Sequence, residues 1–199
     1  MNHTSDDLHG NAPDSSPVAL LIIDMINDLD FPEGPDFLEP TLAAARQITT
    51  LKERAKNAGI PVVYANDNFG KWRSNFDELL THCLTDEVRG KPIVELIRPD
   101  DDDYMVLKPK HSAFYATTLE TLLTYLQTTT LIMTGIAADV CVQFSATDAY
   151  VRDLKLIIPS DCVASGSTVN TQQSLAYMQR VLSADITPSE KIDFQALLG

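Results

Sequence analysis

The stretch VALLIIDM, residues 18–25, decides the fold class of this chain. Six apolar residues follow one another without a polar break, and Asp24 comes directly after them. A continuous apolar run of this length is typical of a strand that is buried on both faces of a parallel sheet. The sequence therefore predicts a sheet covered by helices on both sides, with Asp24 at the carboxyl end of its central strand.

Strand and helix patterns alternate on the carboxyl side of this run. The predicted strands lie at residues 61–67, 104–108, 129–136, 155–161 and 184–187, and the predicted helices at 41–58, 75–83, 119–126, 139–153, 169–182 and from Ser189 onward. Such alternation favours a parallel sheet between two helical layers. We therefore expect an α/β protein: one domain over residues 18–199, built as a three-layer αβα sandwich around a mostly parallel, Rossmann-like six-stranded sheet. Residues 1–17 are polar and acidic, which is typical of a flexible tail.

Composition and charge argue against several classes of partner. The chain carries 15 basic and 28 acidic residues, a formal net charge of −13. A charge of this sign repels phosphate backbones, so nucleic acid is not an expected partner. The apolar runs are too short to span a bilayer, and the first 17 residues lack the apolar centre of a secretion signal, so we expect no membrane association and a cytoplasmic location. Three cysteines without a CxxC spacing indicate reduced thiols.

Three chemically useful side chains fall at or just after predicted strand ends: Asp24, Lys108 and Cys141. Ligands of open α/β sheets bind at the carboxyl ends of the strands. Cys141 follows Asp139, a good N-cap residue, so we expect its thiol in the first turn of a helix, where the helix dipole lowers a thiol pKa. Asp24 could then accept the thiol proton and Lys108 could hold the thiolate, while N–H groups of that turn receive an oxyanion.

Each of these residues also has a commoner structural interpretation. A free cysteine is usually core filler, an aspartate after a strand is usually a turn residue, and a lysine is usually solvated. Their shared position at strand ends is what favours a site.

Three sequence motifs carry a resemblance to a known superfamily. They are LLIIDMINDL (residues 20–29), KPKHSAF (108–114) and GIAADVCVQFSATDA (135–149). In this order they resemble the isochorismatase-like cysteine hydrolases, which include nicotinamidases and N-carbamoylsarcosine amidases. The resemblance implies that Asp24, Lys108 and Cys141 form a catalytic triad, and that a cis peptide joins Ile136 to Ala137. It also implies an oxyanion hole made by the N–H groups of Ala137 and Cys141, and a homo-oligomer, dimer or tetramer.

The resemblance narrows the reaction but not the substrate. Relatives that cleave the vinyl ether of isochorismate commonly lack the cysteine, so Cys141 favours hydrolysis of a C–N bond in a small amide or carbamoyl compound through a thioester, with Asp24 as the base in both steps. Two alternatives stay open: a vinyl-ether hydrolase that uses Asp24 alone, and a non-catalytic binding protein on the same fold. Ala138, Ile26 and Leu29 depart from the family pattern beside the pocket. The predicted pocket walls are Phe69, Trp72 and Tyr115, although aromatic residues more often pack in a core.

The sequence predicts neither a metal nor another cofactor. Nicotinamidases hold a metal with an aspartate and several histidines after the second strand, whereas this chain reads NDNFGKW there (residues 66–72). Its four histidines, at positions 3, 9, 82 and 111, do not reproduce that set. The acidic run at residues 100–103 lacks the loop spacing of a calcium site, so we predict a solvated turn.

Overall fold

The computed structural model describes residues 14–69 and 75–199, which fold around one parallel sheet. The strands lie in the order β3-β2-β1-β4-β5, and β6 also pairs with β4. Their bounds are β1 Val18–Ile23, β2 Val62–Asp67, β3 Tyr104–Lys108, β4 Thr130–Ile136, β5 Lys155–Ile157 and β6 Val163–Ala164. The predicted six-stranded sheet is confirmed. Because the chain runs outward from β1 to β3 and then returns to place β4 on the other side of β1, the strand order reverses there.

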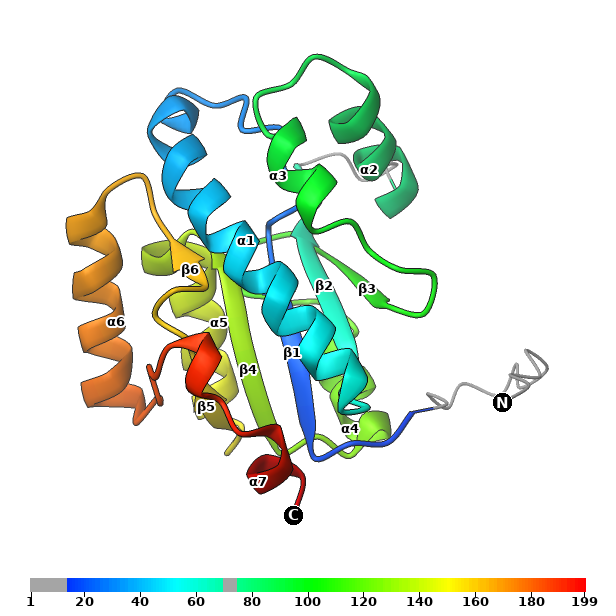
Figure 1. The fold of residues 1–199 in the computed structure, drawn as a ribbon, viewed down its shortest axis with the longest axis vertical. Helices are drawn as coiled ribbons and strands as arrows, with labels where there is room; N and C mark the ends of the chain where they lie inside the picture. Colours follow the sequence, from blue (N-terminus) through cyan, green and yellow to red (C-terminus); the bar gives the residue numbers. More distant parts are fainter. Residues whose placement is uncertain (1–13, 70–74) are drawn as a thin grey trace.

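Helices cover both faces of the sheet (Figure 1). They are α1 Gly34–Asn57, α2 Phe76–Thr85, α3 Lys91–Leu96, α4 Leu119–Leu126, η1 Ala138–Val142, α5 Gln143–Tyr150, α6 Thr168–Leu182, η2 Ser189–Lys191 and α7 Phe194–Leu198. Leu20 and Ile22 of β1 belong to the core that includes α1, α3 and α7, whereas Leu21 and Ile23 belong to the core that includes α4, α5 and α6. This is the alternation of a strand buried on both faces, as its unbroken apolar run predicts.

Two predicted element positions are wrong. Helix α1 begins at Gly34, so Pro40 lies inside the helix; Pro35 stands in its first turn, where no partner for an N–H is needed. The sixth strand is β6, which pairs with the part of β4 that extends beyond β5. Within the predicted strand at 184–187, Asp185 forms an isolated bridge to Ile157.

The acidic run at residues 100–103 is a mostly exposed turn, as predicted, and it is also held by ion pairs through one buried member. Asp103 has a side chain that is 1% exposed, and its carboxylate lies 2.6 Å from Lys52 Nζ. Lys56 Nζ lies 2.8 Å from Asp100 and also binds Asp102. Among residues 14–69 and 75–199, these three aspartates are the acidic, histidine or cysteine side chains that lie close enough together to hold a metal ion. Both lysines already form ion pairs with these carboxylates. We therefore infer that the ion pairs tie α1 to the loop that enters β3.

In the described part of the chain, no helix combines the length and apolar character that crossing a membrane requires.

Candidate active site

The structure brings Asp24, Lys108 and Cys141 together at the carboxyl end of the sheet. Asp24 directly follows β1, Lys108 is the last residue of β3, and Cys141 lies in η1 after β4. Lys108 Nζ is 2.8 Å from Asp24 Oδ2 and 3.5 Å from Cys141 Sγ. The side chain of Lys108 is 0% exposed and that of Asp24 is 7% exposed. A carboxylate, an ammonium and a thiol therefore share one largely dry site.

Asp24 is held in place by the neighbouring strand. Its backbone has a φ of 53°, in the left-handed region that aspartate adopts more readily than most residues. Its N–H donates to the carbonyl of Ala65 (2.9 Å), and its Oδ1 accepts the N–H of Asp67 (2.7 Å). These two bonds to β2 turn the carboxylate across the end of the sheet, toward Lys108.

The close approach of β4 to β1 next to Asp24 requires a glycine. Gly135 has a φ of +114°, and a Cβ at this position would lie 2.0 Å from the carbonyl oxygen of Ile23. A larger residue would separate the two strands whose ends carry Asp24 and the segment leading to Cys141. The peptide bond that follows, between Ile136 and Ala137, is cis.

Cys141 lies in a π-helical turn rather than in the first turn of an α-helix. The N–H of Val142 donates to the carbonyl of Ala137, five residues earlier (3.1 Å). The predicted N-cap is wrong: η1 begins after Ala137, and the carboxylate of Asp139 accepts a hydrogen bond from Ser165 Oγ instead. Ser165 follows β6, so the side chain of Asp139 serves to fix η1 to that strand.

The prediction of a lowered Cys141 pKa is also wrong. Burial, and after it the charge of Asp24, raise the pKa of this thiol to about 12, and Lys108 only partly offsets these two effects. The thiol is therefore protonated at neutral pH and hydrogen-bonded to Asp24. Burial also raises the pKa of Asp24, against the opposing charge of Lys108, and so makes this carboxylate a better proton acceptor. Burial lowers the pKa of Lys108, but its neighbours Asp24, Cys141 and Asp67 together outweigh burial and raise the pKa, so the ammonium persists.

Two further side chains reach the site. Asp67 Oδ2 lies 3.5 Å from Lys108 Nζ, and this carboxylate is 30% exposed. His111 Nδ1 lies 3.9 Å from Cys141 Sγ. Sequence reasoning considered His111 only as a metal ligand, although its place three residues after Lys108 in the KPKHSAF motif was a signal that it lies near the site.

The predicted pocket walls stay predictions. Phe69 is 41% exposed and lines a small cavity together with Asp67 and Leu107. Tyr115 is 60% exposed. Trp72 lies outside the described residues.

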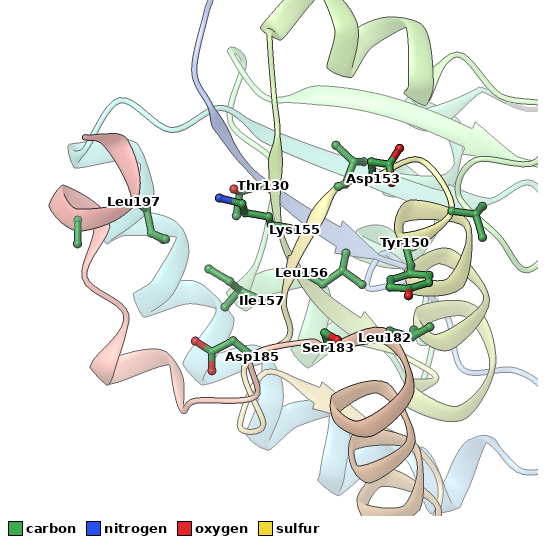
Figure 2. A pocket seen from close by; sticks show the side chains of 13 residues that line it. Thr130, Tyr150, Asp153, Lys155, Leu156, Ile157, Leu182, Ser183, Asp185 and Leu197 are labelled. Carbon is green, nitrogen blue, oxygen red and sulfur yellow. The ribbon is translucent and has the colours of Figure 1, made fainter.

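A larger cavity lies away from the three candidate residues. It measures about 730 Å³, and its lining includes Thr130 and Lys155, the first residues of β4 and β5 (Figure 2). Parallel strands bind ligands at their carboxyl ends, and this cavity lies at their amino ends, so we do not assign the reaction to it.

Comparison with known proteins decides the family. The isochorismatase domain model matches residues 18–190, which is most of the chain. The chain belongs to the isochorismatase family. The isochorismatase family protein YaaI of Bacillus subtilis strain 168 is 44% identical over 174 residues, which cover 87% of this chain and 95% of YaaI.

Other members of the isochorismatase family differ in length and in the reaction that their names describe. The isochorismatase of Bacillus subtilis strain 168 is 31% identical over 171 residues, and the match covers 83% of this chain but 54% of that protein. This chain thus spans about half the length of that relative. The crystal structure of the N-carbamoylsarcosine amidase from Thermoplasma acidophilum superposes with a TM-score of 0.66 at 26% identity, covering 88% of this chain and 98% of the amidase.

The three thiols of this isochorismatase-family chain should differ in reactivity. Cys141 is half-buried, whereas Cys83 and Cys162 are 0% exposed. We expect iodoacetamide at pH 8 to modify Cys141 at least about ten-fold faster than the other two, and the rate at Cys141 to rise about ten-fold per pH unit because the thiolate is the reacting form. Peptide mass spectrometry on a time course measures this. Equal rates at the three thiols would contradict the expectation.

Proposed function

We propose that this isochorismatase-family hydrolase cleaves a C–N bond of a small amide or carbamoyl compound through a thioester on Cys141. The observation that carries the proposal is the position of Lys108 Nζ, 2.8 Å from Asp24 and 3.5 Å from Cys141 Sγ. A buried base beside a thiol, with a fixed cation that balances the charge, is the arrangement that nucleophilic catalysis by cysteine needs.

In the first step the sulfur attacks the carbonyl carbon of the substrate. Because the thiol of Cys141 is protonated in the resting site, its proton passes to Asp24 as the S–C bond forms. The carbonyl oxygen becomes an oxyanion, for which we assign the N–H groups of Ala137 and Cys141 as donors. The C–N bond then breaks, and Asp24 gives the proton to the leaving nitrogen, so that an amine or ammonia departs and a thioester remains.

In the second step water attacks the carbonyl carbon of the thioester. A base accepts a proton from this water, the bond to sulfur breaks, and the sulfur takes up a proton. The products are the free acid and the restored thiol. Lys108 remains an ammonium throughout and offsets the negative charge that resides on Asp24 or on the sulfur.

The vinyl-ether alternative keeps one supporting observation. Burial raises the pKa of Asp24, and a carboxyl group with a raised pKa is suited to protonate a substrate. In that reaction Cys141 would take no part. Alkylation of Cys141 therefore separates the two functions, provided that the added group leaves the pocket open.

A substrate screen tests the proposal. Small amides and carbamoyl compounds are assayed for ammonia or amine release beside isochorismate, with enzyme dialysed against EDTA and with enzyme treated with iodoacetamide. We expect release from a subset of the amides, unchanged after dialysis and lost after alkylation. Turnover of isochorismate that survives alkylation, with no release from any amide, would contradict the proposal. Loss of activity on dialysis that zinc, iron or manganese restores would contradict the metal-free part.

A further inference from the structure

A second carboxylate lies beside the triad, and the proposed reaction gives it no role. Asp67 ends β2 and pairs in register with Lys108, the last residue of β3. Its Oδ2 lies 3.5 Å from Lys108 Nζ, and its side chain is 30% exposed. Asp24, which is 7% exposed, approaches the same ammonium more closely, at 2.8 Å. Two carboxylates thus share one ammonium, and the more exposed of them keeps the capacity to accept another hydrogen bond.

The carboxylate of Asp67 is held in one orientation. Its Oδ1 accepts the N–H of Phe69 (2.6 Å), and its own N–H donates to Asp24 Oδ1 (2.7 Å). The first of these bonds closes a tight turn directly after β2, in which Phe69 has a φ of 51°. Because Oδ1 is occupied in this way, Oδ2 is the oxygen that remains for a ligand. A carboxylate that is already fixed loses little freedom when a ligand binds to it.

The small cavity beside Asp67 is also acidic. Its lining includes the carboxylates of Asp67 and Glu78, the ring of Phe69 and the imidazole of His82. Both ring nitrogens of His82 already have acidic partners: Nδ1 lies 2.7 Å from Asp86, and Nε2 lies 3.1 Å from Asp28. The two carboxylates of the lining therefore give this cavity an excess of negative charge, and an aromatic ring beside them also attracts cations.

The charge around the sulfur decides which substrates bind favourably. Charges a few ångströms apart interact strongly where little water screens them. A carboxylate on the substrate would add a third negative charge beside an ammonium that Asp24 and Asp67 already share. An ammonium on the substrate would instead meet the free acceptor capacity of Asp67. The arrangement thus favours positively charged substrates over negatively charged ones.

We propose that Asp67 determines substrate specificity by binding a positively charged amino group, so that the substrate is a small amide with an ammonium and no carboxylate. This inference rests on the proposed function. Asp67 Oδ2 accepts an N–H of the substrate ammonium while the amide carbonyl lies at Cys141, and Lys108 stays paired with Asp24. No bond forms or breaks at Asp67. Its contribution is therefore to binding, and its loss should appear mainly in KM.

The first test measures the charge around the sulfur without any substrate. Two ethyl methanethiosulfonates, one with a trimethylammonium group and one with a sulfonate, form a mixed disulfide with a thiolate and release methanesulfinate. Peptide mass spectrometry at pH 8 gives both rates at Cys141, and their ratio is divided by the same ratio for 2-mercaptoethanol. We expect the cationic reagent to be favoured about ten-fold, and Asp67→Asn to remove most of this preference. A change in the thiol pKa affects both reagents equally and cancels in the ratio.

The second test compares three amides that differ at one end. 3-Aminopropanamide carries an ammonium, butanamide a methyl group and succinamate a carboxylate, each separated from the amide carbon by two methylene groups. We expect kcat/KM for ammonia release to fall in that order. Asp67→Asn should lower kcat/KM about ten-fold more for 3-aminopropanamide than for butanamide, through KM, because a hydrogen bond between charged groups is lost.

A matched control separates the local charge of Asp67 from the net charge of −13. Glu95→Gln removes one exposed carboxylate of α3 and should change neither the reagent ratio nor the order of the amides. The Asp67→Asn variant keeps its size, and its amide oxygen can still accept the N–H of Phe69; thermal unfolding shows whether it is folded. If Asp67 only supported Lys108, Asp67→Asn would change both reagents, and all three amides, by a common factor.

Failure of this inference and failure of the proposed function give different results. A reagent ratio at Cys141 equal to that of 2-mercaptoethanol, or unchanged by Asp67→Asn, would overturn the role of Asp67 and leave the cysteine mechanism standing. Fastest release from succinamate would do the same. Ammonia release that survives modification of Cys141 would overturn the proposed function itself. If none of the three amides releases ammonia, the reagent ratio alone decides the role of Asp67.

Discussion

Replacing Cys141 with alanine should lower the rate of C–N cleavage by about a thousand-fold or more, because the variant has no atom that can form the thioester. The measured quantity is kcat/KM on an amide identified by the screen. Cys141 is half-buried, so removal of the sulfur should leave cooperative unfolding intact. Cys83→Ala is the matched control, since Cys83 is buried in α2 outside the site and its loss should leave kcat/KM close to the parent value.

A Cys141→Ala variant with near-native turnover would exclude the covalent mechanism. If Asp24→Asn were inactive in the same assay, the vinyl-ether type of reaction, in which Asp24 protonates the substrate, would become the better interpretation.

Replacing Asp24 with asparagine should lower kcat/KM by about a hundred-fold to ten-thousand-fold, the usual range for a lost acid–base group. The substitution preserves size, and the amide oxygen can still accept the N–H of Asp67 that Asp24 Oδ1 now accepts. Near-native cleavage by this variant would refute the role of Asp24 as the base. A thermal unfolding curve, run in parallel, shows whether the variant is folded.

The pH profile of the parent protein gives an independent check on Asp24. Burial raises the pKa of this carboxyl group, and only the carboxylate form can accept the thiol proton. Activity should therefore rise as pH increases through this raised pKa, and the rise should be absent in Asp24→Asn.

The raised pKa of Asp24 has the opposite effect on folding stability, which it lowers as pH rises. A folded-state pKa above the unfolded value gives stability that is present below the unfolded pKa and is lost as pH rises through the folded pKa.

The sheet could be predicted from the sequence because apolar runs mark buried strands. The proximity of Asp24, Lys108 and Cys141 could be predicted because the carboxyl ends of parallel strands lie at the same edge of a sheet. The run at residues 18–25 alone placed Asp24 correctly. The ionisation of Cys141 could not be predicted in the same way. A helix start and a nearby lysine argue for a lowered pKa, but the amount of water removed from the sulfur depends on packing between distant segments, and this desolvation dominates.

The π-turn and the position of His111 depend on contacts that sequence spacing does not reveal. The apolar pattern after β4 suits an α-helix equally well, and the position of η1 is fixed by side chains from α6 and from the residue that follows β6. Ser165 binds Asp139, and Ser174 donates to the carbonyl of Ala138 (2.7 Å). His111 reaches Cys141 because its loop is bonded to α5, which lies beyond it in the chain.

The three residues of the candidate site emerge from the ribosome at different times. Asp24 emerges with β1, Lys108 with β3, and Cys141 after β4, the strand that pairs with β1. Pairing of β1 with β4 closes a long loop, and long-range contacts of this kind form late because their entropic cost precedes their gain. A nascent chain that has paired only β1 with β2 carries the carboxylate without its cation or its sulfur. Under the proposed mechanism, a chain in which β4 has not yet paired with β1 lacks the sulfur at the site and is therefore inactive.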